Sequence, residues 1–132
     1  MVATGATDQE ISAAEQRLGV PFPAELRTLL REQAGSQHRL GDLSVMIHDI
    51  ETIVRVNLEI ERHPGFLAFA SDGSREMIGL DLRAPTRPVV MVDITSAGWA
   101  DALLQAPSLD DFLDRCRRGE PLRWDVPYVD EA

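Results

Sequence analysis

Residues 66–93, FLAFASDGSREMIGLDLRAPTRPVVMVD, decide the fold that we expect for this chain. Three short apolar runs are separated by two turn signals, at 71–74 and at 84–87. Gly73 gives the first turn a residue that adopts a positive φ without strain. Pro88 fits only as the first residue of the third run, because a proline inside a strand removes a ladder hydrogen bond. The stretch therefore predicts three neighbouring strands in the middle of a sheet.

Apolar residues recur at steps of three and four in the flanking sequence, which predicts helices at 7–18, 24–31, 49–62 and 108–118. Thr7 and Glu10 form a capping-box pattern at the start of the first helix, and Asp49 and Ser108 suit the same position in the third and last. The third helix is rich in β-branched residues, which would also suit a strand, but its length and spacing favour a helix. Further strands are expected at 40–47 and, at the edge of the sheet, at 101–105.

With 132 residues the chain has the length of about one domain. Residues 1–6 lack periodicity and are expected to be a flexible N-terminus, followed by a domain over 7–118. The tail at 119–132 is expected to lie against this domain, with Trp124 and Tyr128 covering an apolar seam. The sequence therefore predicts one domain with a packed tail. No internal repeat is evident.

The charge of the chain restricts its partners. It has 22 acidic and 13 basic residues and a net charge of -9, and every basic residue is arginine. Phosphate backbones and anionic lipids would repel such a chain, so we expect neither direct nucleic-acid binding nor membrane binding. A basic protein partner would be attracted, although an acidic surface also serves solubility alone. One cysteine and no apparent leader sequence make the cytoplasm the expected location.

Motifs for catalysis, metals and cofactors are absent from the sequence. His38, His48 and His63 are too far apart for a short metal-ligand pair, so we expect them at the surface or at helix caps. Cys116 falls on the apolar face of the last helix and is expected to be a buried thiol. No serine nucleophile elbow or phosphate-binding loop occurs. The sequence therefore predicts a protein that is not an enzyme, with no cofactor and no metal.

Four acidic residues and one tryptophan are the candidate site residues. Asp72, Glu76, Asp81 and Asp93 lie at or between the predicted central strands. They could form an acidic contact patch for a cationic partner, converge as acid, base or cation ligands, or only close turns and strand ends. Trp99 lies between two small residues in a predicted loop, where it could anchor a protein interface or pack into the core.

Four segments resemble the SUKH superfamily, specifically its Smi/Knr branch. They are the sequences LGVPFPAEL at 18–26, GFLAFASDG at 65–73, GLDL at 79–82 and APSLDDFL at 106–113. The first joins a helix stop, a rigid proline turn and a helix start in a fixed order, which makes it the most specific. With the opening helix that ends at Leu18 and the closing helix, the resemblance covers roughly residues 7–118, almost the whole predicted domain.

The resemblance implies an α+β fold: a single domain with a mostly antiparallel central sheet, an N-terminal helix pair, a middle helix and a C-terminal helix. It implies no enzymatic activity. Bacterial members are interpreted as immunity proteins that neutralise polymorphic toxins, often nucleases, and fungal members as regulators of cell-wall synthesis. We therefore expect an immunity protein that occludes the active site of a cognate toxin. A regulatory scaffold or small-ligand-binding module of the same fold is the alternative.

Overall fold

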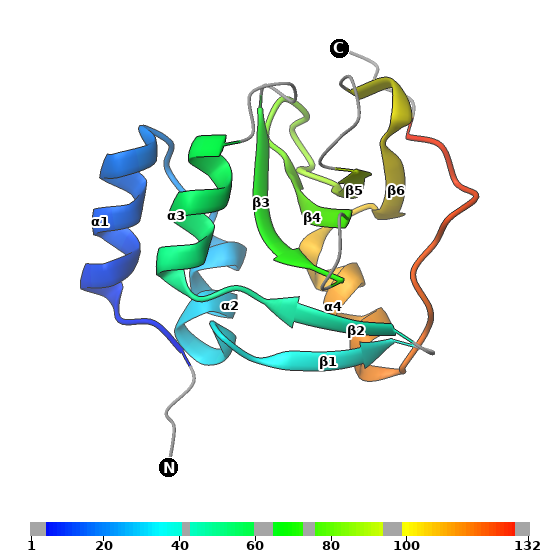
Figure 1. Cartoon of the computed structure of the whole chain (residues 1–132), viewed down its shortest axis with the longest axis horizontal. Coiled ribbons are helices and arrows are strands. Elements are labelled where there is room, and N and C mark those ends of the chain that lie inside the picture. The colour runs from blue at the N-terminus through cyan, green and yellow to red at the C-terminus, as the bar shows by residue number, and fades with distance from the viewer. Residues whose placement is uncertain (1–4, 41–42, 60–64, 73–75, 94–98, 129–132) are drawn as a thin grey trace.

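The computed structural model describes residues 5–40, 43–59, 65–72, 76–93 and 99–128 (Figure 1). Over these residues the chain forms, in order, α1 (Asp8–Leu18), α2 (Ala24–Gln33), β1 (Gln37–Leu40), β2 (Leu43–Ile47), α3 (Ile50–Glu59), β3 (Phe66–Ser71), β4 (Glu76–Asp81), β5 (Val89–Asp93), the 3-10 helix η1 (Trp99–Asp101), β6 (Leu103–Ala106) and α4 (Leu109–Arg117). The strands form one sheet in chain order, each antiparallel to its neighbours. The predicted α+β fold is confirmed. The turn predicted at Gly73, the end of the third helix at 60–62 and residues 1–4 lie outside the described residues.

The predicted helix starts are confirmed by their hydrogen bonds. The Thr7 hydroxyl accepts a hydrogen bond from the Glu10 N–H at 3.1 Å, and the Glu10 carboxylate accepts from the Thr7 N–H at 3.0 Å. Asp49 accepts from the N–H of Thr52 at 2.8 Å, at the start of α3. Ser108 caps α4 in the same way. These local signals fix where three helices begin because each satisfies a backbone donor that the first turn leaves unpaired.

The corner between α1 and α2 is held by charged side chains. The carboxylate of Glu15, in α1, accepts a hydrogen bond from the Phe22 N–H at 2.7 Å and forms an ion pair with Arg27. Glu25, at the start of α2, pairs with Arg87 in the turn between β4 and β5, at 2.9 Å. The segment at 18–26 that carries the most specific resemblance therefore fixes how two helices meet each other and the sheet.

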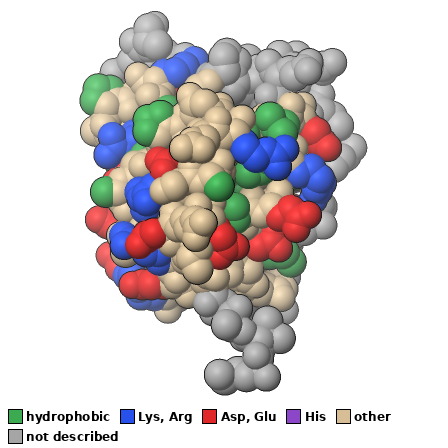
Figure 2. Space-filling model, turned by 90° about the vertical axis from the view of Figure 1, so that its left-hand side faces the viewer, with side chains coloured by type: hydrophobic (Ala, Val, Ile, Leu, Met, Phe, Trp, Pro, Cys, Tyr) green, Lys and Arg blue, Asp and Glu red, His purple; other side chains and the backbone are tan. Residues whose placement is uncertain are grey.

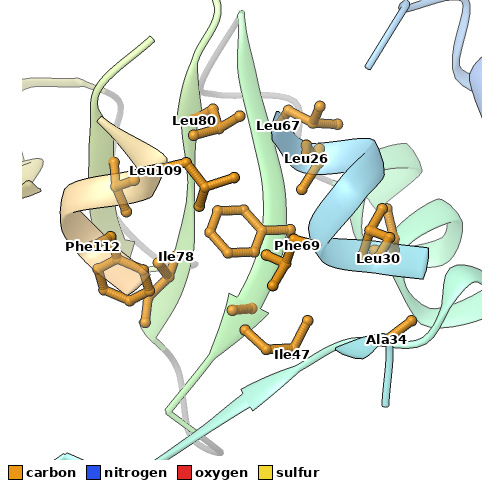
Figure 3. Close-up of a cluster of buried hydrophobic side chains, with 14 of the residues drawn as sticks. Leu26, Leu30, Ala34, Ile47, Leu67, Phe69, Ile78, Leu80, Leu109 and Phe112 are labelled. Atoms are coloured by element: carbon orange, nitrogen blue, oxygen red, sulfur yellow. The ribbon is translucent and has the colours of Figure 1, made fainter. Parts of the chain in front are cut away.

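The larger core lies between one face of the sheet and the helices. Phe69 lies at its centre (Figure 3) and packs edge-on against Phe112 of α4, with ring centroids 6.3 Å apart. Leu26 and Leu30 of α2 lie beside it, and neighbouring strands add Ile78 and other buried side chains. Alternate residues of β4 and β5 point into this core, as the two-residue period of a strand requires, whereas in β3 a register shift between Ala68 and Ala70 places Ala70 there beside Phe69.

The opposite face of the sheet is also buried. Phe66 and Ala68 of β3 and Val90 of β5 form a second core with Val56 of α3, and Trp99 packs against it. Because both faces are covered, the central strands read as continuous apolar runs rather than as alternating ones. This double burial is why residues 66–93 gave so clear a strand signal.

Two sheet edges differ from the sequence expectation. The single strand expected at 40–47 is a hairpin, in which β1 pairs with β2 from Gln37–Met46 to Leu40–Leu43. The strand expected at 101–105 begins later, because Trp99–Asp101 forms η1 and β6 runs from Leu103 to Ala106. Its predicted place at the edge of the sheet is confirmed.

The tail after α4 runs beside β6, along the right of Figure 1. The buried side chain of Gln105 donates to the Arg123 carbonyl at 2.7 Å and accepts from the Arg123 N–H at 2.9 Å. Backbone hydrogen bonds link Leu104 to Val126 and Tyr128 to Ala102. The tail thus pairs with the outer edge of β6, an edge that would otherwise present unpaired backbone groups.

The other chain end is also held where it is described. The Gly5 N–H donates to the Ala34 carbonyl at 2.9 Å, and the Ala6 N–H donates to the Leu30 carbonyl at 2.8 Å. Ala6 is buried. These two residues were expected to belong to a flexible segment, but they close the end of α2, whose last carbonyls need partners.

Asn57 joins α3 to the sheet through its side-chain amide. It donates to the Ala68 carbonyl at 2.8 Å and accepts from the Ala68 N–H at 2.9 Å. The ladder between β2 and β3 pairs only Met46 with Ser71 and Ile47 with Ala70, so it does not extend to Ala68. The Asn57 amide therefore supplies the donor and acceptor that a neighbouring strand would otherwise provide.

Replacing Asn57 with leucine should lower the free energy of unfolding by about 2 to 3 kcal/mol, because both backbone groups of Ala68 lose their partner in a partly buried place. Urea denaturation measures this loss, and hydrogen exchange at the Ala68 N–H should accelerate. Asn57→Asp keeps the acceptor for the Ala68 N–H but turns a carboxylate oxygen toward the Ala68 carbonyl, so it should lose at least as much stability as the leucine variant. A leucine variant as stable as the wild type would contradict this role.

Candidate protein-binding surface

Three of the predicted site residues converge at one end of the sheet. Glu76 begins β4 and Asp93 ends β5, and the two are directly opposite in the antiparallel register. The Asp72 N–H donates to the Glu76 carbonyl at 3.3 Å. All three side chains are partly exposed. We call Asp72, Glu76 and Asp93 the acidic row.

Asp81 does not belong to this row. It lies at the opposite end of β4, and its side chain has 0% exposure. Its carboxylate accepts hydrogen bonds from the Arg83 N–H at 3.0 Å, from Arg83 Nε at 2.9 Å and Nη2 at 3.1 Å, and from the Tyr128 hydroxyl at 2.5 Å. The prediction that Asp81 lies in an exposed contact patch is therefore wrong, since its carboxylate is occupied by partners within the chain.

The hydrogen bonds also set the ionisation of Asp81. Burial raises the pKa of this carboxyl, but the hydrogen bonds from Arg83 and Tyr128 outweigh that effect and leave the pKa below its ordinary value. Asp81 is therefore a charged group stabilised inside the protein. This is a structural role, and the group is poorly suited to exchange protons at neutral pH.

The two tryptophans differ in how far they are buried: Trp99 packs against the core, and Trp124 is exposed. Trp99 is half-buried, packs edge-on against Phe66 with ring centroids 5.8 Å apart, and has the Arg83 guanidinium 3.8 Å from its ring centroid. These contacts favour core packing for Trp99. Trp124, expected to cover an apolar seam, is 50% exposed. Tyr128 does lie inward, where its ring is 6.1 Å from that of Trp99.

The face formed by α1 and α3 has a different character (Figure 2). Acidic and basic side chains are interspersed on it, with scattered apolar ones between them. An open depression on this face is lined by Arg17, Glu51, Val54, Arg55, Leu58 and Glu59. Its mixed charges give no field of one sign, so this face is less suited than the acidic row to attract a strongly basic partner.

Among the described residues, no group of three or more histidine, cysteine or acidic side chains could hold a metal ion. Cys116 is buried, and burial raises the pKa of its thiol to about 11, which keeps it in the unreactive protonated form. In the part of the chain that the structure describes, no helix has the length and apolar character needed to cross a membrane.

His48 departs from the expected surface position. It lies between β2 and α3 with 7% exposure, and its Nε2 has no hydrogen-bond partner among the described residues. Burial lowers the pKa of His48; Asp49 opposes this shift and Arg55 adds to it. The folded protein therefore holds this imidazole in its neutral form at neutral pH.

The stability of the protein should fall as the pH is lowered below about 6.5, the ordinary pKa of histidine. In this range the unfolded chain binds a proton at His48 that the folded chain does not, so the slope is at most about 1.4 kcal/mol per pH unit. Urea denaturation between pH 8 and pH 5 measures it. His48→Gln should flatten the curve of stability against pH. His38 and His63 are still present in this variant, so a flatter curve could not be due to them. If the slope were unchanged in the variant, a group other than His48 would cause the pH dependence.

The sequence was compared with known proteins. The model of the SMI1/KNR4 family (SUKH-1) matches residues 5–115. No curated protein sequence matches the chain. Among the elements that the structure describes, the match spans the four α-helices up to the last turn of α4, together with the six strands, and it includes the acidic row. The chain therefore belongs to the SMI1/KNR4 family (SUKH-1).

Proposed function

We propose that this protein is a cytoplasmic immunity protein that binds a cognate toxin and occludes its active site. Membership of the SMI1/KNR4 family over residues 5–115 is the observation that carries this proposal. The family is generally non-enzymatic and suggests a protein as the partner. Occlusion needs only a surface that fits the toxin, so it places no demand on catalytic groups in this chain.

Charge supports a toxin whose active face is basic, as that of a nuclease would be. The net charge of -9 accelerates encounter with a cationic surface and favours docking over it. The acidic row offers three carboxylates from adjacent positions of the sheet end. We propose that these carboxylates contact the basic substrate-binding surface of the toxin.

The test begins with the tagged full chain, used to capture proteins from a lysate of its own organism at low and at high salt. The C-terminal domain of the captured protein is then expressed in a bacterial host with and without this chain. We expect the domain alone to arrest growth and co-expression to restore it. Capture should weaken as salt increases, because the attraction is partly electrostatic. A captured domain that is harmless to the host would favour a regulatory scaffold instead.

The contact surface is tested by neutralising the acidic row with Asp72→Asn, Glu76→Gln and Asp93→Asn together. Affinity for the toxin should fall about 10-fold to 100-fold, and its salt dependence should decrease. The matched control neutralises three exposed helical acids, Glu32→Gln, Glu51→Gln and Glu59→Gln, with the same change in net charge. Equal effects of the two triple variants would mean that overall charge, and not the acidic row, governs binding.

A further inference from the structure

Trp124 is the most conspicuous apolar side chain on the surface of the tail. Among the described residues three large apolar side chains are exposed: Met46 at 43%, Leu58 at 53% and Trp124 at 50%. Of these residue types tryptophan is the one most enriched among the residues that dominate binding energy at protein interfaces, whereas leucine is under-represented there. Trp124 is therefore the strongest of the three candidates for a contact with another protein.

The backbone on either side of Trp124 is fixed. On one side, the Arg123 backbone makes two hydrogen bonds with the buried Gln105 side chain, and Leu122 is buried. On the other, the Val126 carbonyl accepts from the Leu104 N–H at 2.8 Å. The exposed ring is thus presented on an anchored bend, so a partner would lose little conformational entropy when it orders this segment.

The neighbour of Trp124 indicates what kind of group it would bind. Asp125 is exposed and lies next to it in the same bend. An exposed indole ring and an exposed carboxylate on consecutive residues of one bend suit a cationic side chain, which can lie over the ring while its charge pairs with the carboxylate. The net charge of -9 acts in the same direction by attracting basic proteins and repelling acidic ones.

The position of the bend in the chain adds a second argument. The family model matches residues 5–115, and Trp124 lies beyond them. The tail is nevertheless built onto β6 by the hydrogen bonds of Gln105 and Leu104. A segment that is anchored to the shared fold but lies outside the matched residues can vary in its contacts without disturbing the core.

We propose that Trp124 and Asp125 form a receptor for an arginine or lysine side chain on the surface of the protein partner. This site lies on the tail and adds to the acidic row as a contact that selects one partner among basic proteins. The proposal rests on the proposed function for the identity of the partner, but the cation-binding property belongs to this chain alone and can be measured without the partner.

The first experiment titrates the ¹⁵N-labelled full chain with a short peptide of alternating arginine and glycine, and with a glutamate–glycine peptide of the same length. Trp124→Phe assigns the two indole N–H signals. With the arginine peptide, the Trp124 indole and the Asp125 amide should shift saturably while the Trp99 indole does not, and Asp125→Asn should weaken binding at least about threefold. No shift at Trp124, or an equal shift with the glutamate peptide, would overturn the proposal.

The second experiment uses the captured toxin domain. Trp124→Ser should weaken its binding at least about tenfold, as expected for an anchor residue. Leu58→Ser is the matched control, since it removes an equally exposed apolar side chain from the α1 and α3 face. Both side chains are exposed, so the melting temperatures of both variants should stay close to that of the wild type. Equal losses, or a larger loss for Leu58→Ser, would exclude Trp124 as the anchor.

The two experiments separate the two proposals. If the arginine peptide shifts Trp124 but no toxin is neutralised, the cation receptor stands and the immunity function fails. If a toxin is neutralised and Trp124→Ser binds it as tightly as the wild type, the immunity function stands and the receptor fails.

Discussion

Gly79→Ala is expected to lower the free energy of unfolding by about 3 kcal/mol and the melting temperature by roughly 10 °C. Gly79 lies in β4 opposite Ala68 of β3. A Cβ atom at this position would be 2.4 Å from the Leu67 carbonyl oxygen, 2.7 Å from the Phe66 ring and 2.8 Å from the Ala68 Cα. Two of these atoms belong to the backbone of the adjacent strand and cannot rotate away, so the strands would have to separate.

Gly19→Ala provides the control for this prediction. Gly19 ends α1 with a φ of 67°, and a Cβ atom there would meet nothing within 4 Å. Its replacement costs only the backbone strain of a left-handed conformation, about 1 kcal/mol. Urea denaturation of both variants separates the two causes. If Gly79→Ala lost no more stability than Gly19→Ala, the close approach of β3 and β4 would not be what requires glycine.

The central strands could be predicted because their signals are local. Both faces of the sheet are buried, so each strand is a short apolar run, and turn residues separate one run from the next. Capping side chains are local as well, which is why Thr7, Asp49 and Ser108 marked helix starts correctly. By contrast, β1 was missed because its sequence, Gln37–Leu40, is mostly polar. An edge strand needs fewer apolar residues than a central one, so its sequence resembles a loop.

Contacts between distant parts of the chain could not be predicted. Asn57 was assigned no role, since its partner Ala68 is chosen by where β2 stops pairing with β3. The exposure of Trp124 depends in the same way on Gln105 and Leu104, which fix the path of the tail. These outcomes depend on tertiary geometry, and no short stretch of sequence contains them.

In the candidate site, some features could be predicted from the sequence and others could not. An antiparallel turn brings the end of one strand to the start of the next, so the convergence of Asp72, Glu76 and Asp93 follows from the strand order. Asp81 is five residues after Glu76, and an odd separation in a strand places two side chains on opposite faces. That spacing could have separated Asp81 from the acidic row. Its contact with Tyr128 could not have been foreseen, because the two residues are 47 positions apart in the sequence.

Asp81→Asn is expected to lower the free energy of unfolding by about 3 kcal/mol. An asparagine amide would replace one carboxylate oxygen with an NH2 group, so a donor would face the Arg83 guanidinium there, and the negative charge that pairs with the guanidinium would be lost. Arg83 keeps some contact with water, which limits the loss to the lower part of the range for broken buried ion pairs. Urea denaturation at pH 7 measures the change.

The pH dependence of this loss identifies its cause. Since the Asp81 pKa in the folded state is below its ordinary value of 3.8, the stabilisation is present above that pH and disappears as the pH falls through the folded-state pKa. The difference between wild type and Asp81→Asn should therefore be largest near neutral pH and shrink in acid. Tyr128→Phe removes one hydrogen bond and should cost about 1 to 2 kcal/mol. In the double variant the two losses should not add, because both mutations break the same contact. Additive losses, or an Asp81→Asn variant as stable at pH 7 as the wild type, would contradict the structural role of Asp81.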